Sequence, residues 1–295
     1  MNTHLDCIPC LLKQIIAASR LATKDIVIQE NILEESLKKL THLCRKAAPP
    51  VLAKELHDIV KSLSDNTDPY AEEKRYFNAL MLEKYEHFKD LVKSSSNPLK
   101  TSVLLSIAGN VIDFGAYHHR HEIDISNELD NILNSHLAIN DFRLFEEALN
   151  NAKKVVIFGD NAGEIVLDTL LVKAIGKERV TYVVRGEPII NDATLADAQS
   201  CGMTNICTVI ENGNGFPGTV FEALPKKLQN DFHNADVIIA KGQGNFETMC
   251  KLNHENLFFL LKIKCHILAH EIGYPVNSLI LKKQREKQLQ KPSSN

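Results

Sequence analysis

The stretch VVIFGDNAGE, residues 155–164, decides the fold of this chain of 295 residues. Its first four residues are apolar and β-branched or aromatic, a composition that favours a short buried strand. A polar turn of Gly159, Asp160 and Asn161 follows, and residues 162–164 open a helix. A strand that passes through a polar turn into a helix is the repeating unit of a parallel α/β sheet.

Four later apolar runs have the same character and predict further strands. They lie at residues 180–184, 206–210, 237–240 and 265–269. Continuous apolar runs are typical of parallel strands that are buried on both faces, whereas half-exposed strands alternate. Helical patterns lie between several of these runs, so the sequence predicts an α/β fold with a mostly parallel, doubly wound sheet.

The chain before residue 150 has the periodicity of helices instead. Apolar residues recur three and four positions apart, as on one helix face, near residues 8–16, 33–44, 52–63 and 77–91. We therefore expect an all-helical domain over residues 1–150 and an α/β domain over residues 151–281. The basic segment at 282–295 is expected to form a flexible tail.

The composition indicates a cytoplasmic protein whose partners are neither nucleic acid nor a membrane. The formal net charge is −3, so no basic field favours nucleic acid or an anionic membrane. The densest apolar runs are too short to span a bilayer, and the N-terminus lacks the pattern of a signal peptide. Seven scattered cysteines argue against a disulfide framework. The oligomeric state stays open.

Polar or glycine-rich segments follow all five predicted strands. They lie at residues 159–164, 185–192, 211–219, 241–247 and 270–271. The carboxyl ends of parallel strands share one edge of the sheet, where ligands bind. Asp160, Asn161 and Asp192 offer only oxygen ligands, which suit Mg²⁺ or Mn²⁺ better than a thiolate-binding metal, with Co²⁺ or Ni²⁺ as further candidates. Their carboxylates should repel one another without the metal, so Asp192→Asn is expected to abolish activity and relieve that repulsion.

The same edge suits a phosphate group. The free N–H groups at the start of the helix at Ala162–Glu164 favour an anion. Lys241 can neutralise phosphoryl oxygens, and Gly244 lets the backbone approach a ligand closely. The other candidates for phosphate binding in these segments are Glu164, Arg185, Gly218, Gly242 and Asn245. We expect Asp160, Asn161 and Lys241 to carry catalysis, and Lys241→Ala to spare the fold.

Each of these features has a structural alternative. Asp160 and Asn161 can cap a helix, and Asp192 can cap the helix that contains Leu195. Lys241 can be a solvated lysine, and Glu211–Gly218 can be an ordinary flexible loop. The common position of these segments at one sheet edge favours a functional site.

Taken together, the ordered motifs resemble those of the damage-control phosphatase family, once catalogued only as a domain of unknown function. The matching motifs are DCIPC (6–10), DPY (68–70) with Lys74, GNVIDFG (109–115), GDNAGE (159–164), NDAT (191–194), PGT (217–219) and KGQGNFE (241–247). They run in order along nearly the whole chain. The paired cysteines resemble the microbial branch of that family.

This resemblance implies a three-layer α/β/α domain packed against a helical one, with a metal at the sheet edge. It also implies hydrolysis of small phosphorylated metabolites, including damaged or misplaced ones. The family's metal-binding residues fall on Asp160, Asn161 and Asp192. Its Asn-x-x-Asp motif falls on Asn110 and Asp113, so the segment 104–115 would approach the site from the helical side. The microbial branch does not fix the substrate.

Other functions fit the motifs less well. A haloacid-dehalogenase-like phosphatase would use Asp160 as its nucleophile, but Ala162 stands where its second aspartate is needed. A P-loop is absent, and the G-x-G-x-x-G at residues 213–218 does not follow the first strand. A protein that binds phosphometabolites without turnover remains an alternative. So does attack by the Asp160 carboxylate instead of a water activated by the metal.

Two further groups of residues have no assigned role. Cys7 and Cys10 form a C-x-x-C pair, which can be half of a zinc site, a redox pair or a packing element. The start of a helix there would lower the pKa of one thiol. The second group, His118, His119 and His121, resembles a metal cluster but lies in a polar connection that is typical of solvated surface.

Overall fold

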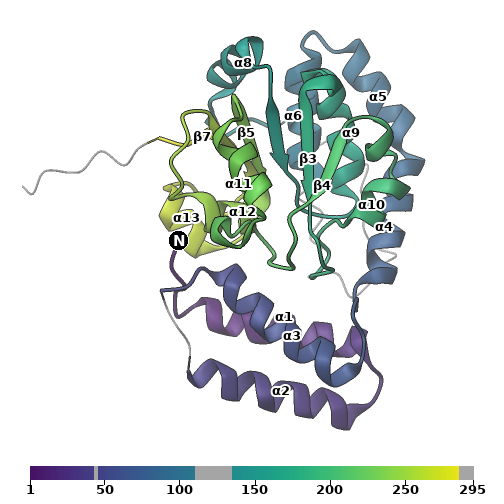
Figure 1. Cartoon of the computed structure of the whole chain (residues 1–295), viewed down its shortest axis with the longest axis vertical. Helices are drawn as coiled ribbons and strands as arrows, with labels where there is room; N and C mark the ends of the chain where they lie inside the picture. The colour runs from purple at the N-terminus through teal and green to yellow at the C-terminus, as the bar shows by residue number, and fades with distance from the viewer. Residues whose placement is uncertain (43–45, 110–134, 286–295) are drawn as a thin grey trace, which may run out of the picture.

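The computed structural model describes residues 1–42, 46–109 and 135–285, and its centre is a seven-stranded sheet (Figure 1). The strands are β1 (Ile139–Asn140), β2 (Val155–Phe158), β3 (Val180–Val184), β4 (Thr208–Glu211), β5 (Val237–Lys241), β6 (Leu257–Lys262) and β7 (Leu279–Lys283). Their order is β1-β7-β6-β5-β2-β3-β4. All neighbouring pairs are parallel except β6 and β7, which confirms the predicted α/β class with a mostly parallel sheet.

Helices cover both faces of this sheet and give three layers. One face carries α4 (Ala71–Glu83), α5 (Tyr85–Ser94), α6 (Pro98–Gly109), α8 (Phe142–Asn151), α9 (Glu164–Ile175) and α10 (Leu195–Ser200). The other carries α11 (Lys226–His233), α12 (Gly242–Met249) and α13 (His266–Ile272). Successive residues of β2 alternate between the two cores, with Val155 and Ile157 on one side and Val156 and Phe158 on the other. Burial on both faces explains why the strand is apolar throughout.

Three N-terminal helices form a separate core. They are α1 (Cys7–Ala22), α2 (Ile26–Thr41) and α3 (Pro49–Ser64), and Figure 1 shows them together at one end of the sheet. Asp25 caps α2 by accepting the amides of Val27 and Ile28. Pro49 and Pro50 begin α3, where a missing N–H costs little.

The helices before residue 150 therefore divide between two cores. The α1–α3 core is separate, whereas Phe77, Phe88 and Val103 of α4–α6 join the core of the sheet. A division of the chain at residue 150 stays a prediction about folding units. The described strand β7 runs through Lys283, beyond the expected start of the tail at residue 282.

One predicted strand is wrong. Residues 266–269 lie in α13 and Cys265 is its N-cap, since the Cys265 side chain accepts the amide of Leu268. Gly273, at φ +84°, ends that helix in the left-handed conformation. The strand at this place is β6, whose apolar run at 257–261 is buried on both faces. The segment 270–271 therefore does not follow a strand. The run predicted at 206–210 corresponds to β4, which begins two residues later.

The order in which the chain adds strands to the sheet changes direction between β2 and β5, which are themselves parallel. From β2 the chain continues through α9 to β3 on one side, and from β5 it continues through α12 to β6 on the other. The carboxyl ends of β2 and β5 therefore flank the topological switch point, where folds of this kind bind ligands. In the described part of the chain, no helix is long and apolar enough to cross a membrane.

Candidate active site

Backbone hydrogen bonds join the segments that follow strands β2 and β3, beside the switch point. The amide of Ala193 donates to the carbonyl of Asp160 over 2.7 Å, and the Arg185 amide donates to the Ala193 carbonyl over 2.9 Å. Asn161 and Asp192 form an isolated antiparallel bridge. The predicted metal ligands Asp160, Asn161 and Asp192 therefore lie together, although they come from two different strand ends.

All three of these side chains are largely enclosed. Asp160, Asn161 and Asp192 are 9%, 7% and 4% exposed. Burial raises the pKa of Asp192, and the neighbouring Arg185 guanidinium opposes that effect by stabilising the carboxylate. Two carboxylates and a carboxamide are the hard oxygen donors that Mg²⁺ or Mn²⁺ prefers, so the residues fit such an ion. Among the described residues, no three His, Cys, Asp or Glu side chains are arranged to hold a metal, so the carboxamide and water would have to complete the site.

Arg185 is the cation of this edge and is almost fully buried. Its Nε lies 2.6 Å from Asp192 Oδ2, and its Nη2 lies 3.8 Å from Asp160 Oδ1 and 3.5 Å from Asn245 Oδ1. Its Nη1 is buried and finds no hydrogen-bond acceptor within the part of the chain that the structure describes. A buried donor of this kind is costly unless an acceptor arrives.

The start of α9 differs from what the sequence predicts. Gly163, at φ +76°, precedes the helix in a conformation that favours glycine. Its amide donates to Asn78 Oδ1 over 2.6 Å, and the amide of Ala162 donates to the carbonyl of Asn191 over 2.9 Å. These two amides are thus engaged within the protein. Asn78 was not predicted, although it lies one helical turn after Lys74 in α4.

Lys241 is enclosed at the end of β5 and has no exposed surface. Its Nζ contacts Glu164 Oε1 and lies 2.6 Å from Asp168 Oδ1 and 3.3 Å from the carbonyl of Ser106. The alternative that Lys241 is a solvated lysine is therefore wrong, and its contact with phosphoryl oxygens stays a prediction. Asp168 was missed, although it lies one turn after Glu164 on the same face of α9.

Asn245 joins the ends of the two central strands from inside α12. Its Nδ2 donates to the carbonyls of Gly159 over 3.0 Å and Lys241 over 2.8 Å, and its Oδ1 accepts from Thr219 Oγ1 over 2.8 Å. Asn245 has no exposed surface. The side chain therefore holds the loop before α11 against both strands, and its predicted role in phosphate binding stays untested by these contacts.

The glycines of these segments let the loop pack on α12. A Cβ at Gly244 would lie 2.0 Å from the carbonyl oxygen of Pro217, and one at Gly218 would lie 2.6 Å from the carbonyl oxygen of Gly244. Gly242, at φ +76°, begins α12. The close approach at Gly244 is thus one of backbone to backbone. Binding of phosphate at Gly218 and Gly242 stays a prediction.

Cys7 lies near the same edge from the helical side. The thiol is half-buried, and burial raises its pKa, with further contributions from Glu247, Cys265 and Cys10. The expected lowering of a thiol pKa at the helix start is therefore wrong for Cys7. Burial also raises the pKa of Glu247 to about 7, and nearby Asp160 adds to that effect. Glu247 was not predicted, and its Oε1 accepts from Gln243 Nε2 over 2.7 Å.

A contact from the helical layer reaches the segment before Asp192. Lys61 of α3 donates to the carbonyl of Pro188, and Ile190 packs against the core of α1–α3. Ile190 adopts φ +45°, a strained conformation for a β-branched residue. The α1–α3 layer therefore borders the site.

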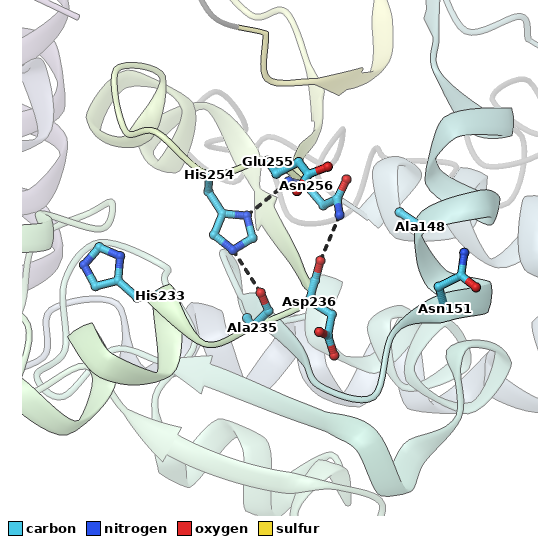
Figure 2. Close-up of a pocket in the computed structure, with 8 residues that line it drawn as sticks. All are labelled: Ala148, Asn151, His233, Ala235, Asp236, His254, Glu255 and Asn256. Atoms are coloured by element: carbon cyan, nitrogen blue, oxygen red, sulfur yellow. Dashed lines mark hydrogen bonds between the residues drawn. The ribbon is translucent and has the colours of Figure 1, made fainter.

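A further pocket lies at the opposite edge of the sheet. It has a volume of about 440 Å³ and lies beside His233 and His254, at residues that precede β5 and β6 (Figure 2). His254 Nε2 lies 3.0 Å from the carbonyl of Ala235, and Asn256 Nδ2 donates to the carbonyl of Asp236 over 3.1 Å. Because the polar groups of this pocket are bonded to nearby backbone, we place the candidate site at the switch point.

Part of the predicted site lies outside the described residues. This is so for Asn110, Asp113 and the three histidines at 118, 119 and 121. The described end of α6 does reach the site, because a Cβ at Gly109 would lie 3.0 Å from the Cα of Glu164.

Comparison with known proteins gives a consistent result. Residues 3–280 match the family described as "Damage-control phosphatase ARMT1-like domain". The chain is 35% identical to a damage-control phosphatase of Archaeoglobus fulgidus, over 94% of this chain and 97% of that protein. It is 31% identical to one of Pyrococcus horikoshii, over 97% and 100%. It also resembles the crystal structure of a DUF89 family protein from P. horikoshii, with a TM-score of 0.88, 28% identity and coverage of 97% of this chain and 100% of that one.

Proposed function

The chain belongs to the damage-control phosphatase family, and from this premise we propose that it is a metal-dependent phosphomonoester hydrolase. Its substrates are small phosphorylated metabolites, including damaged or misplaced ones. The net charge of −3 gives no reason to propose a nucleic-acid or membrane partner. No disulfide joins the cysteines of the described residues, which suits a reducing cytoplasm.

We assign the metal to Asp160, Asn161 and Asp192, which share one enclosed point of the sheet edge. A divalent ion there, Mg²⁺ or Mn²⁺ in the first place, supplies Lewis-acid polarisation of the phosphoryl group and an activated water. The residues themselves orient the ion and keep bulk water away. Arg185 stabilises the Asp192 carboxylate through a contact of 2.6 Å and so opposes the rise that burial causes in the pKa of Asp192.

The observation that carries this proposal is the buried Nη1 donor of Arg185, which has no hydrogen-bond acceptor among the described residues. Its Nε and Nη2 face protein oxygens, whereas Nη1 has no acceptor among the described residues. A phosphoryl oxygen is an acceptor of the right charge, and a guanidinium binds it with directed hydrogen bonds. Arg185 would then hold the phosphoryl group beside the predicted metal ligands and stabilise the charge that develops on it.

The decisive experiment measures phosphate release by the full chain after its metals are stripped with a chelator. We expect no turnover of an aryl phosphate until Mg²⁺, Mn²⁺, Co²⁺ or Ni²⁺ is added, and selective turnover in a panel of phosphorylated metabolites. A non-catalytic binder would gain thermal stability from those metabolites and release no phosphate. Trapping of an Asp160 phosphorylated during turnover would show attack by Asp160 rather than by water.

A further inference from the structure

We propose that Glu164, held by Lys241 and Asp168, is a positioning residue that decides which atom of the Asn161 side chain faces the metal. The inference rests on the proposed function, because it assumes a metal at Asn161. It gives a role to a buried network under the site that neither metal binding nor phosphate binding uses.

The amide nitrogen of Asn161 lies between two carboxylates. Nδ2 donates to Asp160 Oδ2 over 3.0 Å and to Glu164 Oε2 over 3.3 Å. The Glu164 Oε2 atom also accepts the backbone amide of Asn161 over 3.4 Å. A carboxamide carries its two donors on one side and its acceptor oxygen on the other. With the nitrogen directed at two carboxylates, Oδ1 is the atom left to bind a cation.

Glu164 is itself held in place from below. Its Oε1 contacts Lys241 Nζ, which lies 2.6 Å from Asp168 Oδ1. Asp168 accepts the hydroxyls of Ser106 and Tyr182, both over 2.6 Å. None of these side chains is more than 1% exposed. Buried charges with this many partners are fixed in geometry, because each lost contact leaves a polar group unsatisfied.

The network requires an acceptor at both oxygens of residue 164. One oxygen faces the Lys241 ammonium and the other faces the Asn161 amide, and both partners are donors. A glutamine at this position has only one acceptor. It would turn its oxygen to the ammonium, where the interaction is stronger, and its NH₂ towards Asn161. Asn161 would then reverse its carboxamide and present NH₂ to the metal.

The test is the affinity of the metal-stripped protein for Mn²⁺, measured by titration calorimetry on wild type and Glu164→Gln. We expect a Kd 10- to 100-fold weaker in the variant, as is usual when a residue that orients a ligand is changed. The near-UV circular dichroism without metal should be unchanged. Asp231→Asn, at the opposite end of β5, is the control for loss of a paired carboxylate.

A second variant separates orientation from general damage. In Glu164→Gln combined with Lys241→Met the ammonium is gone, so the glutamine oxygen can turn to Asn161. Recovery of Mn²⁺ affinity by tenfold or more over the single variant supports the proposal. Wild-type affinity in Glu164→Gln, or no recovery in a folded double variant, overturns it while leaving the phosphatase assignment standing. If Glu164→Gln does not fold, Asp168→Asn replaces it, and unchanged Mn²⁺ affinity in that variant also overturns the proposal. Failure of wild type to bind Mn²⁺ or to release phosphate refutes the proposed function instead.

Discussion

Arg185 Nε lies 2.6 Å from Asp192 Oδ2, and both side chains are almost wholly enclosed. The sequence suggests that Asp192 is chiefly repelled by Asp160, and that its neutralisation relieves the metal-free protein. The structure places a guanidinium beside Asp192 instead. A buried pair that loses one charge leaves the other uncompensated, so the stability of the metal-free protein should fall rather than rise.

Asp192→Asn is therefore expected to abolish metal-dependent phosphate release and to lower the free energy of unfolding without metal by about 1–3 kcal/mol. Asparagine still accepts from Arg185 but carries no charge. Urea unfolding in a chelator and activity with Mn²⁺ measure the two effects. Asp231→Asn should retain activity, and retained activity in Asp192→Asn as well would make Asp192 only a structural residue.

Arg185→Lys tests the open donor at Nη1. Lysine keeps the charge but lacks the planar fork, so it cannot reach Asp192 and a phosphoryl oxygen together. We expect kcat/KM for an aryl phosphate to fall by about 10²–10³-fold, the usual cost of a lost donor to developing charge. Steady-state kinetics at saturating Mn²⁺ give the value. The exposed Arg143→Lys is the control, and an equal loss in both variants would contradict the role of Arg185.

Lys241→Ala should destabilise the protein, contrary to the expectation from the sequence that it spares the fold. The substitution leaves Glu164 and Asp168 buried without their shared cation. Loss of one partner from a buried ionic cluster costs about 3–5 kcal/mol. Urea unfolding measures the loss of unfolding free energy in Lys241→Ala. Lys154→Ala is the control, because its more exposed pair with Asp231 should contribute at most about 1 kcal/mol. An equal loss of stability in the two variants would contradict the burial of Lys241 between Glu164 and Asp168.

Acid should weaken the α1–α3 layer through His57. Burial, together with nearby Lys61, lowers the pKa of His57 to about 3. Between pH 3 and 6.5 the unfolded chain therefore binds a proton that the folded chain does not, so stability falls as the pH drops through this window. His57 should contribute a loss of about 2 kcal/mol between pH 6.5 and 5. Urea unfolding at both pH values should show a smaller loss in His57→Phe, and parallel losses in both proteins would exclude His57 as the cause.

The central strands could be predicted from sequence because their burial on both faces makes them apolar throughout. The residues of β2 show this, and the polar turn after them marks the sheet edge correctly. The run at 265–269 is less uniformly apolar, since it contains His266, and it begins a helix that Cys265 caps and Gly273 ends. β7 was not predicted as a strand, and its last two residues, both lysines, fall in the basic segment that the sequence predicts to be the tail.

The least predictable feature was the state of Lys241. A lysine at a strand end is solvated in one protein and buried in another, and the difference depends on its partners. Here the partners are Glu164 and Asp168 of α9 and the carbonyl of Ser106 in α6. Together with Lys241 they come from three separate stretches of the chain, so their meeting follows from the tertiary structure and not from local spacing.

The pairing of β1 has a consequence for the order in which the molecule is assembled. Ile139 and Asn140 pair with Ile280 and Leu281 of β7, nearly half the chain away. As the ribosome delivers the chain from its N-terminus, β2, β3, β4 and β5 can pair before β7 emerges, whereas β1 has to wait. Contacts between residues so distant in sequence form slowly. This border of the sheet should close last, and until it does the outer side of β6 offers an open edge to other unfinished chains.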